Sequence, residues 1–454
     1  MVKLTIKPEA KHIIHRLQAH GYEAFAVGGC VRNALLGLCP HDWDICTNAK
    51  PDEMRAVFAD YVTHDFGLKH GTLVVMMGEE QYEVTTYRVD GVYADNRHPE
   101  QVSFTDNLTL DLSRRDFTVN AMAYNDEQGF VDPFGGREDL KNGILRCVGN
   151  PDKRFNEDSL RIMRGVRFAA TYGFAVEQET AAAIHRNAAL LHRIAAERIR
   201  VELTGAVCGE HVLPVFAEFR DVLATVIPEL REAFDFEQKN KHHCYDVWEH
   251  ILHAVAAIGR DPLLRVTMLL HDIGKPRACT TDKYGSRHFK GHQQISADMA
   301  SVILKRMTFP NAFTADCLQL IIAHDIRFDG TQRQVKRVLQ KLGEANMRRL
   351  FAVQRADIGA QSDYHRAEKL AAVATAERQF EELMRSRACV ALRDLAVNGS
   401  DLMAIGYQEG RAVGTALNRL LDAVIDGQLP NEREKLLRAA EQFKSIDNNN
   451  TILK

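Results

Sequence analysis

The sequence predicts an α+β protein: a small mixed α/β head with a short β-sheet, followed by an extended all-α neck, body and tail. Three observations support this fold class. Strand-like and helix-like patterns alternate over the first 142 residues, and two of the strand-like runs are joined by a hairpin signal. Beyond the turn at residues 132–136, apolar residues recur at spacings of three and four, which is typical of amphipathic helices. The length of 454 residues corresponds to about three domains.

Each element of the head is predicted from its local pattern. A Gly-Gly pair at 28–29 separates an apolar run from an amphipathic one, and Gly-Glu-Glu at 78–80 separates two β-rich runs. The expected elements are, in order, a helix at 11–19, a strand at 24–27, a helix at 31–36, and strands at 71–77 and 81–88.

The rest of the chain is expected to be helical. The clearest helices are at 160–170, 180–191, 195–207, 247–258, 263–270, 296–306 and 432–443. We divide the chain into a head (1–142), a neck (143–210), a body (211–365) and a tail (366–454).

Composition excludes several classes of protein. With 45% hydrophobic and 26% charged residues, the chain is neither disordered nor a disulfide scaffold. The nine cysteines are odd in number and form no Cys-x-x-Cys, so we expect reduced thiols in a cytoplasmic protein and no zinc ribbon. No apolar run reaches the roughly 20 residues of a membrane span.

The charge is unevenly distributed. The whole chain has 58 Lys and Arg against 61 Asp and Glu, a formal net charge of −3 that gives no sign of nucleic acid. Residues 137–200, by contrast, contain 12 basic and 8 acidic residues. A basic neck in a mildly acidic protein is compatible with a surface that faces phosphates.

The segment VGGCVRNALLGLCPHDWDI (27–45) carries the first chemical pattern. Gly28 and Gly29 follow a predicted strand and open a helix, where backbone N–H groups can approach a phosphate, and Arg32 can reach the same anion. In a strand, Asp42 and Asp44 point to one face, and two adjacent carboxylates favour a hard cation such as Mg²⁺. Glu83 is the best-placed third carboxylate. This arrangement indicates metal-dependent phosphoryl transfer.

These motifs resemble the nucleotidyltransferase head of the polymerase β superfamily. More narrowly, residues 22–210 are similar to class II tRNA nucleotidyltransferases, the CCA-adding enzymes, and to the related bacterial poly(A) polymerases. The strings that carry the resemblance are VGGCVRNALLG, HDWDI, GLKHGTLVV, EVTTYR, RRDFTVNAMAY, DPFGGREDLKNGILRCVG, RFNEDSLRIMRGVRFAATYGF and ERIRVEL. One departure is Asn33, at a place where the family usually has Asp.

The resemblance implies an enzyme that adds CCA to the 3′ end of tRNA from CTP and ATP, with Mg²⁺, and releases pyrophosphate. On a helix, Asp158 and Arg161 are three residues apart and lie on one face. The resemblance implies that this pair acts as a protein template for the base. Cytosine and adenine both present an amino donor beside a ring-nitrogen acceptor, which a carboxylate and a guanidinium can recognise, whereas uracil and guanine present the reverse pattern. The other implied nucleotide contacts are Arg115, Asp116, Arg164 and Arg167, supported by Asn120, Glu157, Glu197, Arg198 and Glu202.

A second pattern lies in the body. His250, His271, Asp272, His292, His324 and Asp357 follow one another in an order that resembles the HD superfamily of metal-dependent phosphohydrolases. Imidazoles and carboxylates on neighbouring helices can enclose one or two transition-metal ions. The resemblance implies a possible additional phosphatase or cyclic-phosphodiesterase activity.

Three alternatives remain open from the sequence. A poly(A) polymerase, or an enzyme that adds only A or only CC, would share the motifs quoted above, and we expect the polar segment 90–111 to decide between them. An enzyme of a different class, an HD phosphohydrolase with a vestigial head, is less compatible with Asp42 and Asp44. The sequence does not define the oligomeric state.

Overall fold

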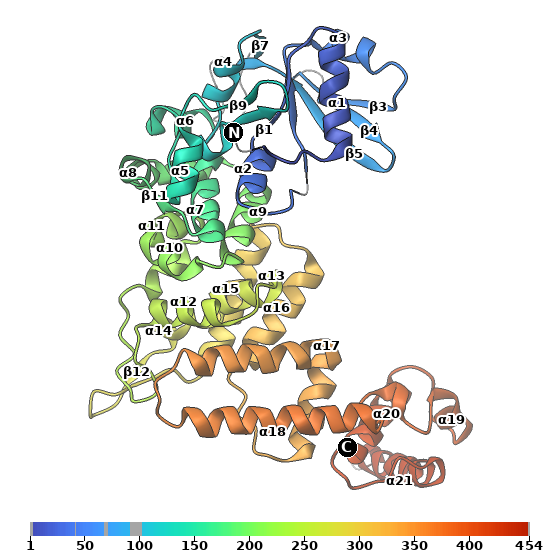
Figure 1. Ribbon diagram of the computed structural model, residues 1–454. Coiled ribbons are helices and arrows are strands. Elements are labelled where there is room, and N and C mark those ends of the chain that lie inside the picture. The colour runs from blue at the N-terminus through green and yellow to red at the C-terminus, as the bar shows by residue number, and fades with distance from the viewer. Residues whose placement is uncertain (1–2, 41, 68–70, 91–101, 453–454) are drawn as a thin grey trace. The chain divides into compact units, whose positions relative to one another are not determined.

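The computed structural model describes residues 3–40, 42–67, 71–90 and 102–452 (Figure 1). It contains two compact units, one formed by Met1–Arg231 with Ile303–Phe309 and one formed by Glu232–Val302 with Pro310–Lys454. The predicted fold class, a mixed α/β head followed by an almost wholly helical chain, is confirmed. Part of the segment 90–111, residues 91–101, lies outside the described residues.

The head contains a seven-stranded sheet with the strand order β3-β4-β5-β2-β1-β8-β9. Neighbouring strands are antiparallel except β2 and β5, which are parallel. The strands are β1 (Ala24–Val27), β2 (Ile45–Thr47), β3 (Thr63–Gly67), β4 (Thr72–Met77), β5 (Glu80–Thr86), β8 (Ala123–Asn125) and β9 (Gly129–Val131). The predicted hairpin is β4 and β5, joined at Gly78, whose φ of 66° suits a glycine.

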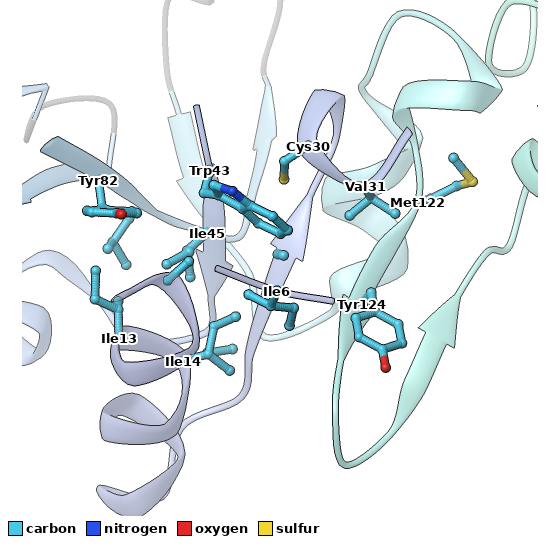
Figure 2. Close-up of a cluster of buried hydrophobic side chains, with 14 of the residues drawn as sticks. Ile6, Ile13, Ile14, Cys30, Val31, Trp43, Ile45, Tyr82, Met122 and Tyr124 are labelled. Atoms are coloured by element: carbon cyan, nitrogen blue, oxygen red, sulfur yellow. The ribbon is translucent and has the colours of Figure 1, made fainter. Parts of the chain in front are cut away.

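Both faces of the sheet are packed against other elements, because successive apolar residues of a strand point to opposite faces. Ile45 packs with Trp43 and with Ile13 and Ile14 of α1 (Pro8–Ala19) on one face (Figure 2). The adjacent residue Cys46 packs in a second cluster on the other face. This period of two fixes which residues next to β2 turn toward the core and which turn away from it.

The neck lies in the same unit as the head. Its helices are α6 (Pro151–Glu157), α7 (Leu160–Tyr172), α8 (Gln178–Asn187) and α9 (Ala196–Val207). The first two helices of the predicted body, α10 (Val212–Glu218) and α11 (Arg220–Val226), belong to the same unit. The helix predicted at 180–191 ends earlier, at Asn187, and a 3₁₀ turn follows over Ala188–Arg193. Asn187 Nδ2 donates to the Ala183 carbonyl and to Asp152, a local bonding pattern that competes with helix continuation.

The second unit is a stack of helices. They are α12 (Val247–Ala257), α13 (Pro262–Leu270), α15 (His292–Arg306), α16 (Asn311–Ala323), α17 (Gln332–Gly359) and α18 (Arg366–Arg385). The end of α15, from Ile303 onward, belongs to the first unit. α17 and α18 run side by side (Figure 1), and α17 is kinked at Gly343. The tail helices α19 (Gly399–Ala404), α20 (Arg411–Ile425) and α21 (Arg433–Ile452) have an apolar core of their own.

Two expectations about the whole chain can be compared with the structure. All nine cysteines lie in the described ranges and all are free thiols. Within those ranges, no helix combines the length and the apolar character that crossing a membrane requires.

Candidate functional site

Asp42, Asp44 and Glu83 lie beside one another on the head sheet. Ile45 of β2 pairs with Val84 of β5 in parallel register, so Asp44 and Glu83, each one residue earlier, are neighbours. Ile45 and Val84 both point into the core, which directs Asp44 and Glu83 to the opposite face. Asp42 and Asp44 are exposed on either side of the buried Trp43, as the alternation predicts.

The electrostatics of these carboxylates favour a cation. Although Asp44 is exposed at the cavity, desolvation by the protein atoms around its carboxyl group raises its pKa; Arg115 opposes this rise and Asp42 adds to it. Burial also raises the pKa of Glu83, and the charges of Asp44 and Asp42 raise it further. The three groups therefore repel one another, and an oxygen-liganded divalent ion such as Mg²⁺ would relieve that repulsion. The residues present fit such an ion.

A cavity of about 470 Å³ lies next to Asp42 and Asp44. It brings together most of the predicted nucleotide contacts: Gly28, Gly29, Arg32, Arg115, Asp116, Asn120, Arg164 and Arg167. Gly28 has a φ of 79°, and a Cβ there would come within 2.9 Å of Arg115 Nη1, so the close approach requires glycine. Glu83, Asp158 and Arg161, although described, are not part of this lining.

A chain of hydrogen bonds links the opposite walls of the pocket. Arg32 donates to Asn120 Oδ1, and Asn120 Nδ2 donates to Asp116 Oδ1 at 2.9 Å. Asp116 Oδ2 in turn pairs with Arg164 at 2.7 Å. Burial raises the pKa of Asp116, but Arg164 and Asn120 outweigh this and lower it to about 2. Asp116 is therefore an anion at neutral pH, bound to both the 114–124 segment and α7.

Asn33 keeps an acceptor where the family usually has Asp. Its Oδ1 accepts from Arg32 Nε at 3.1 Å and Nη2 at 2.9 Å, and from the Tyr172 hydroxyl at 3.1 Å. Asn33 thus accepts three hydrogen bonds without carrying a negative charge.

The arginines of α7 are supported from α9. Arg167 Nε lies 2.7 Å from Glu202 Oε2, and Arg164 Nη1 lies 3.8 Å from Glu202 Oε1. The pKa of Glu202 is raised, because burial raises it more than the two arginines lower it. These contacts support the predicted role of Glu202. Glu197, in contrast, is exposed in the first turn of α9.

Asp158 and Arg161 do not share one helix, contrary to the premise of the sequence argument. Asp158 lies in the joint between α6 and α7 with extended backbone (φ −135°, ψ 102°), and its carboxylate accepts from the Leu160 N–H at 3.1 Å. Asp is favoured at such a helix start. The Asp158 carboxylate lies 3.4 Å from Arg198, and Arg161 bonds Glu157 at 3.0 Å and the Arg114 carbonyl at 2.7 Å.

Two aromatic residues of the pocket were not predicted from the sequence. Phe168 and Tyr172 line the cavity and contact Arg32, whose guanidinium carbon lies 5.0 and 4.6 Å from their ring centroids. Both lie in the string RFAATYGF, where the helical apolar spacing indicates only core packing. The available signal was Arg164, four positions before Phe168 and therefore on the same face of a helix.

The second unit brings all six predicted HD residues together. Two groups of potential ligand atoms, each within 4.8 Å of one another, share Asp272: His250, His271, Asp272 and Asp357 form one, and Asp272, His292 and His324 form the other. Asp272 Oδ2 faces His250 at 3.0 Å, while Oδ1 faces His292 at 3.2 Å. A carboxylate shared in this way can bridge two cations.

The four histidines are oriented alike. Each Nδ1 lies within hydrogen-bond distance of a backbone carbonyl, those of Ala360, Met268, Phe289 and Ile321 for His250, His271, His292 and His324, at 3.1, 2.7, 2.8 and 2.6 Å. When Nδ1 donates to these carbonyls, each Nε2 lone pair points into the cluster, as in metal-bound histidines. His292 Nε2 and His324 Nε2 face each other at 3.2 Å, an arrangement that needs a proton or a metal between them.

The charges in the cluster also favour the binding of metal ions. Burial lowers the pKa of His271, but Asp272 and Asp357 outweigh it and raise it to about 10. The carboxylates thus draw positive charge into a fully buried site. Lys275 Nζ, 2.6 Å from Asp272 Oδ2, is a further contact that the sequence argument did not single out. The residues fit one or two transition-metal ions.

A cavity of about 670 Å³ opens on the HD cluster. Asp272, His292, His324 and Asp357 lie among its lining residues. Its cationic side chains are Lys241, Lys275, Arg287, Lys290 and Arg327. A cavity with this charge suits an anionic ligand.

Three regions of the chain match known protein families. Residues 24–146 match the family described as "Poly A polymerase head domain". Residues 173–234 match "Probable RNA and SrmB- binding site of polymerase A", and residues 291–440 match a family described as tRNA nucleotidyltransferase domain 2.

Similar proteins extend over nearly the whole chain. A CCA-adding enzyme of Geobacillus stearothermophilus is 35% identical over 442 residues, 94% of this chain and 95% of its own. A CCA-adding enzyme of Enterococcus faecalis is 33% identical over 453 residues, 98% of this chain and 99% of its own. The crystal structure of the Bacillus stearothermophilus CCA-adding enzyme in complex with CTP is similar with a TM-score of 0.73 and 29% identity, covering 98% of this chain and 100% of that one.

Proposed function

The chain belongs to the family of CCA-adding enzymes, nucleotidyltransferases that act on tRNA, and we propose that its head pocket joins nucleotides from CTP and ATP to the tRNA 3′ end. The observation that carries the proposal is the placement of Asp42 and Asp44 beside a cavity lined by four arginines. Carboxylates for a metal and cations for a triphosphate are the two requirements of this chemistry.

Asp42 and Asp44, with Glu83 beside them, would hold Mg²⁺, which supplies a Lewis acid for the 3′-hydroxyl and the departing pyrophosphate. Arg32, Arg164 and Arg167 bind the triphosphate. Arg115 lies between Gly28 and Asp111, which holds its guanidinium in the pocket wall. Catalysis by this chain is then mainly positioning and electrostatic stabilisation.

We propose that Asp158 and Arg161 select the base. Asp158 accepts from the exocyclic amino group of cytosine or adenine, and Arg161 donates to the adjacent ring nitrogen. Their present partners, Arg198 for Asp158 and Glu157 for Arg161, would exchange for the base when a nucleotide binds. The contacts of the Asp158 carboxylate support this exchange. Among the described residues, it accepts a hydrogen bond from Leu160 N and forms a 3.4 Å ion pair with Arg198.

The helical regions would bind tRNA. Double-stranded RNA is recognised mostly by its shape and backbone, so we assign the neck to nucleotide and acceptor-end contacts and the body and tail to the rest of the tRNA. The match of residues 291–440 to a tRNA nucleotidyltransferase domain supports this assignment. We place this activity in the cytoplasm.

The experiment that tests this proposal uses three tRNAs, ending before CCA, after CC and after CCA. Each is incubated with Mg²⁺ and with each nucleoside triphosphate alone or with CTP and ATP together. Full CCA addition requires two cytidines and one adenosine on the first tRNA, one adenosine on the second and none on the third. Addition of A alone, of CC alone, or of long A tails would instead identify an A-adding enzyme, a CC-adding enzyme or a poly(A) polymerase. No transfer to any tRNA would contradict the proposal.

A second activity is favoured by the HD cluster. We propose that this cluster would hold transition-metal ions, which would supply Lewis-acid chemistry for the hydrolysis of a phosphate ester bound in the basic cavity. The residues that would hold the ions are His250, His271, Asp272, His292, His324 and Asp357. The inward-facing Nε2 atoms support this proposal. The assay offers tRNA with a 3′-phosphate or a 2′,3′-cyclic phosphate, with Mn²⁺ or Ni²⁺. Asp42→Ala should retain hydrolysis and Asp272→Asn should lose it; loss in both, or in neither, contradicts a separate HD site.

A further inference from the structure

Phe168 of α7 is surrounded by three guanidinium groups in the nucleotide pocket. The Cζ atoms of Arg32, Arg164 and Arg167 lie 5.0, 5.1 and 4.7 Å from the centroid of its ring. All four residues line the same cavity, although the Phe168 side chain is only 5% exposed. A cation at this distance from an aromatic face is attracted by the ring quadrupole.

The orientation of the ring is fixed by its neighbours. Phe117 meets it edge-on, with ring centroids 5.8 Å apart and an interplanar angle of 85°, and the Tyr172 centroid lies 6.1 Å away. Edge-to-face packing holds an aromatic ring in one orientation. A rigid neutral surface therefore lies among three like charges that would otherwise repel one another.

The arginines around Phe168 carry more positive charge than their partners neutralise. Arg164 pairs with Asp116 and Arg167 with Glu202. Arg32, in the part of the chain that the structure describes, hydrogen-bonds only neutral oxygens, those of Asn33, Tyr172 and Asn120. Three cations against two carboxylates leave a net positive charge at the ring, which suits a polyanion.

We infer that Phe168 is a positioning residue for the phosphates of the incoming nucleotide, holding Arg32, Arg164 and Arg167 together so that they contact one polyphosphate chain. The inference rests on the proposed function of the pocket. Without the ring face, the long arginine side chains gain rotamer freedom that nucleotide binding must then remove. Affinity for a polyphosphate should fall, while the reacting groups at Asp42 and Asp44 remain in place.

The experiment compares Phe168→Leu with Phe174→Leu in the full-length protein. Phe174 is a matched control because it is 6% exposed, belongs to the same apolar core and stacks on Tyr172 with centroids 5.3 Å apart. Titration calorimetry with pyrophosphate and with CTP, both with Mg²⁺, measures affinity, and steady-state kinetics measures KM and kcat. Phe168→Leu should weaken both ligands about tenfold, as loss of cation–π contacts at a partly desolvated site implies. Its KM for CTP should rise more than its kcat falls, and Phe174→Leu should stay within about twofold of the wild type.

The outcomes distinguish a failure of the role inferred for Phe168 from a failure of the nucleotide-pocket assignment. Equal weakening in the two variants would show that Phe168 acts by packing alone and would overturn the inference. If the wild type binds neither ligand, or if Arg164→Gln leaves both affinities unchanged, the nucleotide pocket itself is wrongly assigned. Should Phe168→Leu fail to fold, Phe168→Met fills more of the space and should show the same loss, whereas Phe168→Tyr keeps the ring and should keep the affinity.

Discussion

Asp116 and Arg164 form an ion pair that joins the two sides of the nucleotide pocket. Asp116 Oδ2 lies 2.7 Å from Arg164 Nη2 and accepts from Arg164 Nε at 2.8 Å. Its other oxygen accepts from the Phe117 N–H at 2.8 Å and from Asn120 at 2.9 Å. Asp116 is 7% exposed, so the pair lies in a poorly hydrated place where each partner needs the other.

This pair should make the stability of the head sensitive to acid. The pKa of Asp116 is about 2 in the folded protein, below its ordinary value of 3.8, so the unfolded chain binds the proton more tightly. The resulting stabilisation, about 2 kcal/mol, is fully present above about pH 4 and is lost as the pH falls toward 2. We expect Asp116→Asn to be less stable than the wild type at pH 7 and the difference to shrink between pH 4 and pH 3. Thermal unfolding at those pH values measures it, and a difference independent of pH would contradict the assignment.

Replacement of Asp42 or Asp44 by Asn should abolish nucleotide transfer without unfolding the head. Both side chains are exposed, and neither contributes to the apolar core around Trp43. Loss of a metal ligand removes several kcal/mol of transition-state stabilisation, a rate loss of about 10³-fold or more. Glu83→Gln should lose less, because Glu83 does not line the cavity. Single-turnover rates at several Mg²⁺ concentrations test this, and circular dichroism verifies the fold. A variant of Asp44 with full activity would exclude it as a metal ligand.

The shared face of Asp42 and Asp44 was predictable from the sequence because strand geometry is local. Two carboxylates two apart next to an apolar strand must share a face, and the register of β2 and β5 then places Glu83 beside them. The HD cluster was predictable for another reason. Its residues lie in distinctive strings, and their order along the chain was sufficient to group them.

The surroundings of the nucleotide could not be predicted in the same way. Asp158 was expected on a helix with Arg161, but a helix break between α6 and α7 depends on which backbone N–H groups the Asp158 carboxylate bonds. Phe168 and Tyr172 have the spacing of core residues, and their contact with Arg32 joins positions more than 130 residues apart. Such a contact follows from tertiary packing, which periodicity does not encode.

Base selection should depend on Asp158 and Arg161 separately from transfer itself. Exchanging the two residues, so that Arg lies at 158 and Asp at 161, should shift preference from CTP and ATP toward UTP or GTP. Each base contact discriminates by about 1–3 kcal/mol, so Asp158→Asn alone should reduce the preference for CTP over UTP by about tenfold or more. Competition between CTP and UTP on a tRNA lacking CCA measures the ratio. Glu197→Gln, at an exposed position on α9, is the control and should leave the ratio unchanged. Unaltered selectivity in both Asp158 and Arg161 variants would exclude the base-template role.

Metal binding at the HD cluster should be stoichiometric and should stabilise the second unit. Asp272 faces both ligand groups, so the wild type should bind two ions of Mn²⁺ or Ni²⁺, His292→Ala about one, and Asp272→Asn neither tightly. A ligand that binds only the folded state stabilises it by about 2.7 kcal/mol when the free ligand concentration is about 100 times the Kd. The midpoint of thermal unfolding should therefore rise when metal is added and fall when a chelator removes it. His253→Ala is the matched control, because His253 lies on α12 with His250 but stacks on Tyr245. Elemental analysis after dialysis gives the stoichiometry. Equal metal content in the His253 and Asp272 variants would exclude Asp272 as a ligand, and absence of bound metal from the wild type would show that hydrogen bonds and protons hold the cluster together.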